Sequence, residues 1–361
     1  MLSPIQFSMR TLSVYHLTRA LASKASIFVK CNWQKSQLTD DEIMVRQDFD
    51  RNIIQEMGVL GFLRSTIDGY DCAGIFSLSY GLTAREVEFV DSGYRSAMSV
   101  QSSLVIHPTY AYGTETQKEI NGIKIGYFVL TEPDHGSVAG METIAKKVDG
   151  HCVFNGSKTW ITNSSIADDM IVWAKNLDED GAIRGFILER VMADIETPTL
   201  QGKMSLRPTI TGTLMLDNVQ VPVANMLSNI EGINCPFRCL NNTLYGICWG
   251  SLGATDTWLT QAHDYTWNII NLMIKKKLAD FNTETYIGLQ ACLQVVKRNP
   301  TIKALEISRE AHDTLGGNGV SAEYNIIRQM NNLEIVVTSE ETKDMHTLIL
   351  GRSITGIPAF Q

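Results

Sequence analysis

The order in which hydrophobic periodicities follow one another is the feature that most constrains the fold. Apolar residues recur at helical spacing over about 38–126, in strand-like runs bounded by Gly, Pro, Asn and Asp over 127–227, and at helical spacing again over 228–361. This α–β–α order predicts an α+β subunit. Its parts are an N-terminal helical domain, a middle β domain and a C-terminal helical bundle, with the boundaries just given.

Composition narrows the class of protein. The 361 residues are 44% hydrophobic and 19% charged, which is ordinary for a globular chain of two or three domains. A net charge of −8 argues against nucleic-acid binding. The apolar runs are too short for a membrane span. The seven cysteines form no C-x-x-C pair and have no histidine close to Cys235 and Cys239, so we expect buried thiols and no metal site.

The N-terminal segment has the composition of a targeting leader. Residues 1–39 contain no Asp or Glu, but include Arg10, Arg19, Lys24, Lys30 and Lys35 together with six serines. This pattern is typical of a mitochondrial presequence, which we place at 1–37, and it predicts a location in the mitochondrial matrix. An unstructured tail is the alternative.

Two motifs in the middle region place hydroxyl groups and an indole on neighbouring strands. They are Leu-Thr-Glu-Pro at 130–133 and Lys-Thr-Trp-Ile-Thr-Asn at 158–163. A layer that presents threonine hydroxyls beside a tryptophan suits a flat heterocycle that forms hydrogen bonds. The alternative is that these residues only pack a half-buried sheet, where Thr and Trp are common.

Together these motifs resemble the flavin-binding middle domain of the acyl-CoA dehydrogenases, and the chain is most similar to the glutaryl-CoA dehydrogenase branch of that family. The likeness runs from about residue 33 to 360 and includes the segments at 90–103, 240–242 and 348–352. It implies FAD as cofactor, an acyl-CoA substrate, electron-transferring flavoprotein as electron acceptor, and a homo-oligomer, in this family a homotetramer.

The resemblance also implies roles for the motif residues. Thr131 and Thr162 would hydrogen-bond the flavin ring, and Trp160 would stack near it. Ser137 would contact the phosphates or the substrate, and Thr342 belongs to the cofactor-binding set.

Removing hydrogen from an acyl thioester needs a base for the α-proton and an acceptor for the β-hydride. No side chain accepts a hydride, so a cofactor is required, and a carboxylate in a dry site can serve as the base. In the family the base is the Glu of a late Tyr-Glu-Gly-Thr motif, which matches Glu340 here; its backbone N–H would bind the thioester oxygen. Some relatives carry the base on an earlier helix, where this chain has Thr243. Read from the residues alone, Glu340 and Glu341 are solvent-facing charges.

Glu88, Arg95 and Ser96 match residues that surround the distal carboxylate of the substrate in glutaryl-CoA dehydrogenase. An arginine fork binds a carboxylate with two hydrogen bonds, whereas a long apolar tail would leave it unpaired. The resemblance therefore implies a dicarboxylic acyl group. A surface Glu–Arg pair at helical distance is the alternative.

The chain departs from the family pattern at several points. An Arg-x-Gln-Phe-Gly loop that reaches a neighbouring subunit's FAD is missing after Asn268, and Leu244 replaces an arginine. Ser339 and Glu341 replace the Tyr and Gly that flank the base. Further segments are shorter near 49–52, 119–124 and 297–301.

Three functional hypotheses follow. The first is an FAD-dependent enzyme that converts glutaryl-CoA to crotonyl-CoA. The second is a degenerate paralogue that binds acyl-CoA or family subunits without turnover, because the cross-subunit loop is missing. The third keeps the chemistry on another acyl group.

Overall fold

The computed structural model describes residues 51–70, 72–120, 124–136, 140–230, 232–266, 272–293, 297–339 and 342–357. The predicted presequence lies outside these ranges. The helices are α3 (Arg51–Val59), α4 (Ser77–Glu88), α5 (Ser92–Ser99), the π-helix η1 (Val100–Ile106), α6 (His107–Tyr112), α7 (Glu115–Ile120), α8 (Asn234–Thr266), α9 (Leu272–Leu293), α10 (Arg298–Leu315), α11 (Ile326–Thr338) and α12 (Lys343–Thr355). The strands are β1 (Gly126–Val129), β2 (Ile144–Val148), β3 (His151–Thr162), β4 (Asp169–Asn176), β5 (Ala182–Glu189), β6 (Ile195–Glu196) and β7 (Thr211–Pro222). Short 3-10 turns are η3 (Leu177–Glu179), η4 (Val223–Asn225), η5 (Gly316–Val320) and η6 (Ala322–Tyr324).

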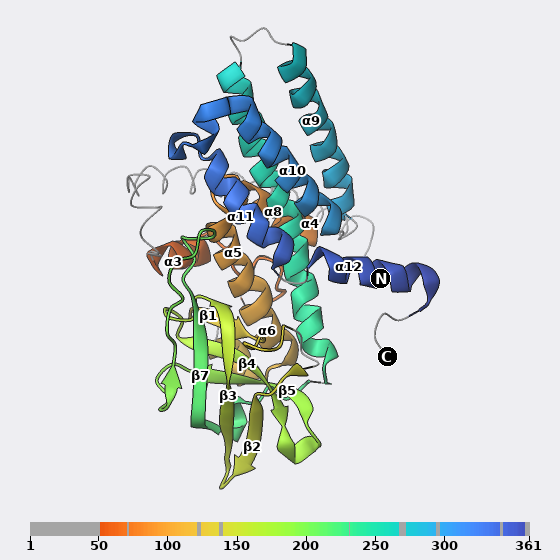
Figure 1. Ribbon diagram of the computed structural model, residues 1–361. Coiled ribbons are helices and arrows are strands. Elements are labelled where there is room, and N and C mark those ends of the chain that lie inside the picture. The colour runs from red at the N-terminus through yellow and green to blue at the C-terminus, as the bar shows by residue number, and fades with distance from the viewer. Residues whose placement is uncertain are drawn as a thin grey trace, which may run out of the picture.

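The strands form one curled, seven-stranded sheet at the lower end of the molecule (Figure 1). The order is β1-β4-β2-β3-β7-β6, and β5 pairs with β4. Only β1–β4 and β2–β4 are parallel among the described pairs. Phe154 and Phe186 pack edge to face inside it, with ring centroids 4.8 Å apart. These rings belong to a hydrophobic core that continues from the sheet into α3, α4, α5 and α8.

β7 is one continuous strand, although polar residues separate its apolar runs at 213–216 and 219–222. Its ladder with β3 passes from Phe154↔Val219 to Asn155↔Asp217, so Asn218 is an extra residue opposite the partner strand. Asn218 has a φ of 55°, which Asn tolerates better than most residues. The polar residues between the two runs therefore form a β-bulge and do not end the strand.

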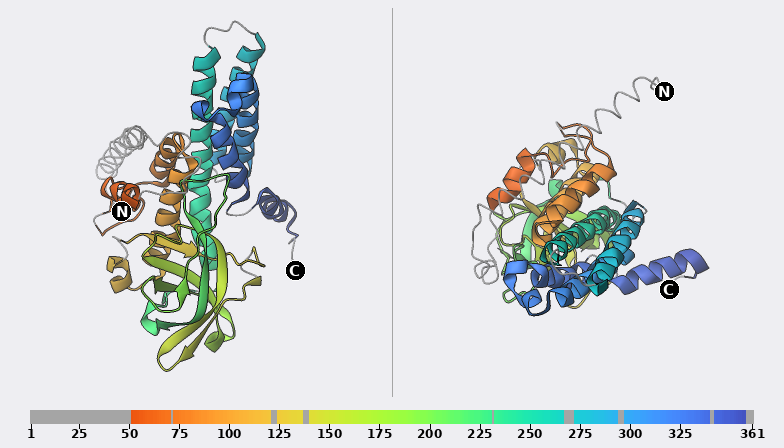
Figure 2. Two further views of the ribbon diagram at one scale, coloured as in Figure 1. Left: turned by 60° about the vertical axis from the view of Figure 1, so that its left-hand side comes forward. Right: turned by 90° about the horizontal axis from the view of Figure 1, so that it is seen from above.

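Most of the helices lie above the sheet, while α6 and the lower end of α8 reach down beside it (Figure 1). α4 and α5 pack beside the long helix α8, which continues upward to pack with α9, α10 and α11 (Figures 1 and 2). The buried indoles of Trp249 and Trp258 lie along α8. The 3-10 turn η6 precedes α11 and does not continue into it, because Asn325 has a φ of 56° and the α-helix starts at Ile326.

Side chains of α11 bind the turn between α4 and α5, although the two segments lie far apart in the sequence. Arg328 forms an ion pair with Asp91, the N-cap of α5, and the Gln329 side chain donates to the Val90 carbonyl at 3.2 Å. The β domain reaches the same helix, because the Leu206 N–H donates to Asn332 Oδ1 at 2.7 Å. All three parts of the chain therefore meet at α11.

The predicted fold class is confirmed: helices, then a curled β domain, then a helical bundle. Among the residues that the structure describes, no helix combines the length and apolarity needed to cross a membrane.

Candidate active site

Thr131 and Trp160 are neighbours at one end of the β domain. Thr131 follows β1 and is half-buried, and its carbonyl accepts a hydrogen bond from the Thr159 N–H at 2.9 Å. The β3–β7 ladder shifts between Lys158 and Ile161, and within this irregularity Trp160 adopts a φ of 60°. Such a backbone is uncommon for a bulky residue and is often found at functional sites.

This backbone leaves the indole of Trp160 65% exposed, instead of packed into the sheet. The structure thereby excludes the alternative in which Trp160 only fills the core. Thr162, at the end of β3, is half-buried like Thr131. An exposed aromatic ring with two half-buried threonines on the same motif strands has the chemistry that a flat, hydrogen-bonding ring requires. These residues fit the ring of FAD.

A buried ion pair lies directly beneath these residues. Lys158 and Glu132 are 2.9 Å apart, with side chains 0% and 5% exposed, and Lys158 Nζ also donates to the Leu130 carbonyl at 3.0 Å. Burial lowers the pKa of Lys158 to about 8 despite its partner. For Glu132 burial acts to raise the pKa, but hydrogen bonds from Thr143, Lys158 and Glu142 outweigh it and lower the pKa to about 2. Glu132 is therefore ionised at neutral pH.

Glu88 and Arg95 form a second buried pair, where α4 ends and α5 begins. Arg95 Nε donates to Glu88 Oε2, and the two side chains are 0% and 3% exposed. The two residues are paired, as in the alternative expectation, but the pair is buried and does not lie on one helix face at the surface, because the turn at 89–91 brings the residues together from different helices. The predicted role of these residues around a substrate carboxylate stays a prediction. Ser96, the next residue on α5, is half-buried.

Arg95 retains hydrogen-bonding capacity in this position. Within the described part of the chain, Glu88 is its sole acceptor, and that bond uses Nε, so neither Nη has a protein acceptor there. Glu88 Oε1 is also buried without a hydrogen-bond partner. Buried guanidinium and carboxylate groups are normally satisfied, so this pair has unused hydrogen-bonding capacity for one more polar group.

α8 covers this pair with a glycine. A Cβ added to Gly250 would lie 2.6 Å from Glu88 Oε2 and 2.9 Å from Arg95 Nε. Any side chain larger than hydrogen therefore pushes against the pair. Gly250 is a site residue that the sequence did not single out.

The remaining predicted residues are not brought together by the described contacts. Ser137 and Glu340 lie outside the described residues. Thr342 is exposed, and its hydroxyl caps α12 by accepting from the Met345 N–H at 3.4 Å. In the described ranges no contact joins Thr342 to Thr131 or Trp160. Just before Glu340, the Ser339 carbonyl accepts from the buried ammonium of Lys297.

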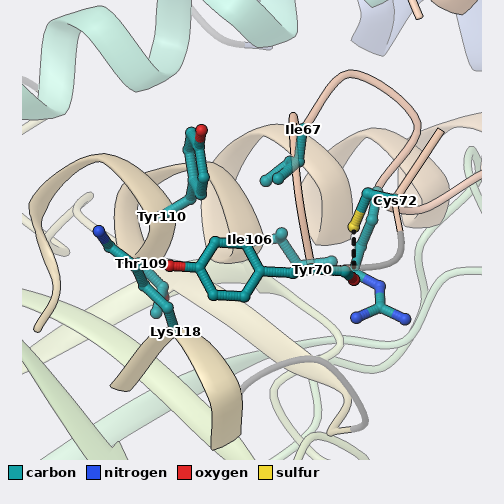
Figure 3. Close-up of a pocket in the computed structure, with 8 residues that line it drawn as sticks. Ile67, Tyr70, Cys72, Ile106, Thr109, Tyr110 and Lys118 are labelled. Atoms are coloured by element: carbon teal, nitrogen blue, oxygen red, sulfur yellow. Dashed lines mark hydrogen bonds between the residues drawn. The ribbon is translucent and has the colours of Figure 1, made fainter. Parts of the chain in front are cut away.

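A small pocket in the N-terminal domain is a separate feature (Figure 3). Tyr70 and Tyr110 line it edge to face, and the Tyr70 hydroxyl bonds to Glu115 at 2.5 Å. Its free volume of about 20 Å³ admits roughly one water molecule. It is therefore too small for an acyl-CoA.

Sequence reasoning also missed Glu132 and Lys158, although both belong to the motifs that it quoted. The available signal was a charged residue of each sign inside strand segments whose other members are apolar or hydroxylic. Opposite charges in two segments that must be adjacent suggest a buried pair.

Comparisons with known proteins agree with this geometry. Residues 19–120 match the N-terminal domain of acyl-CoA dehydrogenases, and residues 127–219 match their middle domain. A glutaryl-CoA dehydrogenase structure from Mycobacterium smegmatis, in complex with FADH2, superimposes with a TM-score of 0.87 and 34% identity over 95% of this chain and 96% of that chain.

Two sequence relatives act on short acyl chains according to their names. The short-chain-specific acyl-CoA dehydrogenase of Megasphaera elsdenii is 29% identical over 85% of this chain and 90% of its own length. The mitochondrial short-chain-specific acyl-CoA dehydrogenase of Homo sapiens is 26% identical over 82% of this chain and 81% of its own length. With the exposed Trp160, the paired motif strands and the α–β–α subunit, these matches show that the chain belongs to the acyl-CoA dehydrogenase family, whose cofactor is FAD.

Proposed function

We propose that this protein oxidises glutaryl-CoA to crotonyl-CoA and carbon dioxide, with FAD as hydride acceptor and electron-transferring flavoprotein as the next electron carrier. The observation that carries the substrate assignment is the buried guanidinium of Arg95, held by Glu88 through Nε and with both Nη groups free of described acceptors. A terminal carboxylate separated from the thioester carbonyl by three methylene groups is the partner that satisfies them.

Glu340 takes the α-proton of the thioester, and its backbone N–H stabilises the charge that develops on the carbonyl oxygen. Bound FAD supplies the acceptor for the β-hydride. The distal carboxylate then leaves as carbon dioxide, and a proton is added at the carbon that it leaves. When FAD is bound, Thr131 and Thr162 would hydrogen-bond its flavin ring, Trp160 would stack near the ring, and Ser137 and Thr342 would complete the contacts.

Arg95 and Ser96 orient the distal carboxylate, and Glu88 fixes the guanidinium. A fatty acyl tail in this position leaves the Nη groups buried without an acceptor, which costs about 1–3 kcal/mol. The pair therefore selects against uncharged acyl chains as well as for a carboxylate.

The first experiment is a visible absorption spectrum of the purified protein, without residues 1–39, after incubation with FAD and removal of free cofactor. We expect a yellow protein whose flavin bleaches with glutaryl-CoA. Glu340→Gln should keep the colour and slow bleaching by about 10²–10⁴-fold. The neighbouring Glu341→Gln is the matched control and should bleach at nearly the normal rate. Equal rates in both variants contradict the assignment of the base.

A second experiment tests the substrate. Because Arg95→Met alone leaves Glu88 buried and unpaired, the informative variant is Glu88→Gln/Arg95→Met, with Glu88→Gln alone as control. The loss of a charge-assisted contact of about 1.5–3 kcal/mol predicts a fall of roughly 10–100-fold in kcat/KM for glutaryl-CoA. Butyryl-CoA, which lacks the carboxylate, should be affected far less. If the ratio of kcat/KM for glutaryl-CoA to kcat/KM for butyryl-CoA is unchanged in the variant, Arg95 does not recognise glutaryl-CoA.

The second hypothesis, a paralogue without turnover, follows from the loop that is missing after Asn268. It predicts a colourless protein, or a yellow protein that no acyl-CoA bleaches. The same spectrum therefore distinguishes the two hypotheses.

We further propose a homo-oligomer in the mitochondrial matrix. The N-terminal segment without acidic residues supports the mitochondrial location. The exposed apolar residues on α9 and α12 support self-association of the chain. The mitochondrial location is tested by incubating the radiolabelled chain with isolated mitochondria. We expect the chain to be imported and cleaved near residue 37. Failure to import contradicts it.

A further inference from the structure

We propose that the buried Glu132–Lys158 pair positions Thr131 and Trp160 for the flavin ring, and so sets FAD affinity without touching the cofactor. The inference rests on the proposed flavin contacts of Thr131 and Trp160. It assigns a role to two charged side chains that the chemistry of dehydrogenation does not use.

Lys158 holds the chain on both sides of Thr131. Its ammonium donates to the Leu130 carbonyl at 3.0 Å and pairs with the Glu132 carboxylate at 2.9 Å. The carbonyl of Thr131, between them, accepts from the N–H of Thr159 at 2.9 Å. Three consecutive residues of the first motif are therefore fixed by two consecutive residues of the second, and Trp160 comes next in the chain.

Glu132 extends this clamp to a third segment. Its carboxylate accepts from the Thr143 N–H at 2.9 Å, from the Thr143 hydroxyl at 2.6 Å and from the Glu142 N–H at 2.6 Å. Close packing supports the same junction, since a Cβ on Gly156 would lie 2.6 Å from Thr143 Oγ1. The loop that carries Thr131 is thus tied to β3 and to the start of β2.

Burying this loop does not by itself require a charged network. Two charges inside a protein cost free energy that their attraction barely repays, and an apolar pair of similar volume is often as stable. Retaining the charges is explained if they fix one backbone geometry. Around Trp160 that geometry includes the uncommon φ of 60°.

The test compares FAD binding in variants of the whole chain. Lys158→Met and Glu132→Gln are titrated with FAD by flavin fluorescence, and near-ultraviolet circular dichroism shows that each apoprotein is folded. Visible circular dichroism of the bound flavin reports how the ring is seated. The matched control is Lys124→Met, which removes an ion pair with Asp169, also at 2.9 Å, near the opposite end of β1.

We expect the FAD dissociation constant to rise at least tenfold in Lys158→Met and Glu132→Gln, with an altered visible dichroism, and to stay within twofold in Lys124→Met. If Lys158→Met does not fold, Glu132→Gln and Glu132→Gln/Lys158→Met carry the test. Dissociation constants within twofold of the wild type in the folded variants, or an equal rise in Lys124→Met, overturn the inference.

Trp160→Ala and Thr131→Val separate this inference from the contacts on which it rests. If they weaken FAD binding and the ion-pair variants do not, the contacts stand and only the positioning role fails. If neither set weakens binding, the proposed flavin contacts fail as well.

Discussion

Glu132 keeps its charge in a buried position because donors surround its carboxylate. Lys158, the Thr143 hydroxyl and two backbone N–H groups all point at it. Its pKa of about 2 lies well below the ordinary value of 4.5. A depressed carboxyl pKa means that the unfolded chain binds the proton more tightly. The stabilisation is therefore present above about pH 4.5 and disappears as the pH falls towards 2.

This difference predicts an acid-labile fold. The contribution of Glu132 to the free energy of unfolding amounts to about 3 kcal/mol, at roughly 1.4 kcal/mol per pKa unit. In urea unfolding at pH 5, 4, 3 and 2, the wild type should lose about this much more than Glu132→Gln, which has no carboxyl to protonate at that position. Parallel losses in both proteins contradict the assignment.

The two buried pairs show what the residues alone could and could not predict. The motifs indicated that Thr131, Trp160 and Thr162 share a layer, because each motif is local. The partner of Lys158 depends on strand register across the sheet, which the motifs do not encode. Glu88 and Arg95 are seven residues apart, a spacing that fits one helix face. Their burial depends on the turn between α4 and α5 and on the approach of α8, neither of which this spacing encodes.

At the scale of elements, α8 approaches α4 and α5 through its glycines. Cβ atoms at Gly246, Gly250 and Gly253 would all press on atoms of the N-terminal helices. This close approach brings backbone from one helix directly over side chains of the others. The helical spacing over 228–361 predicted helices in this region. It did not predict that α8 contacts α4 and α5 closely, because the distance between two helices depends on which of their faces pack together.

Gly250→Ala tests this contact. The added methyl should displace the Glu88–Arg95 pair, destabilise the protein by about 1–3 kcal/mol and weaken glutaryl-CoA binding. Gly351→Ala on α12 is the control, since no atom lies within 4 Å of its Cβ. There alanine should stabilise the helix by about 0.5–1 kcal/mol. Thermal unfolding and acyl-CoA titration measure both effects, and equal behaviour of the two variants contradicts the packing argument.

At the scale of the whole molecule, α12 stands apart from the bundle (Figures 1 and 2). It exposes several large apolar residues, and so does α9. The exposed residues of α12 are Leu348, Ile349, Leu350 and Ile354, and Ile357 follows the helix. Those of α9 are Met273, Tyr286, Ile287 and Leu293. Exposed apolar surface of this kind is typical of an interface. It supports the proposed homo-oligomer.

Ile354→Asp should therefore weaken self-association, because a charge in a covered apolar interface is costly. Light scattering after gel filtration should show an oligomer for the wild type and a smaller species for the variant. Val191→Asp in the β domain is the control, since Val191 is equally exposed and lies far along the chain from α9 and α12. A monomeric wild type contradicts the homo-oligomer.

The corner at Glu88–Asp91 also has a consequence for biosynthesis. The residue that closes it, Gln329, follows Glu88 by 241 positions. At about 5–20 residues per second, the ribosome makes the second partner roughly 10–50 s after the first. The β domain, whose ladders join residues within 126–222, emerges completely in that interval. The β domain can therefore fold before the C-terminal helices are synthesised. α4 and α5 become covered only after α8 and α11 have been made.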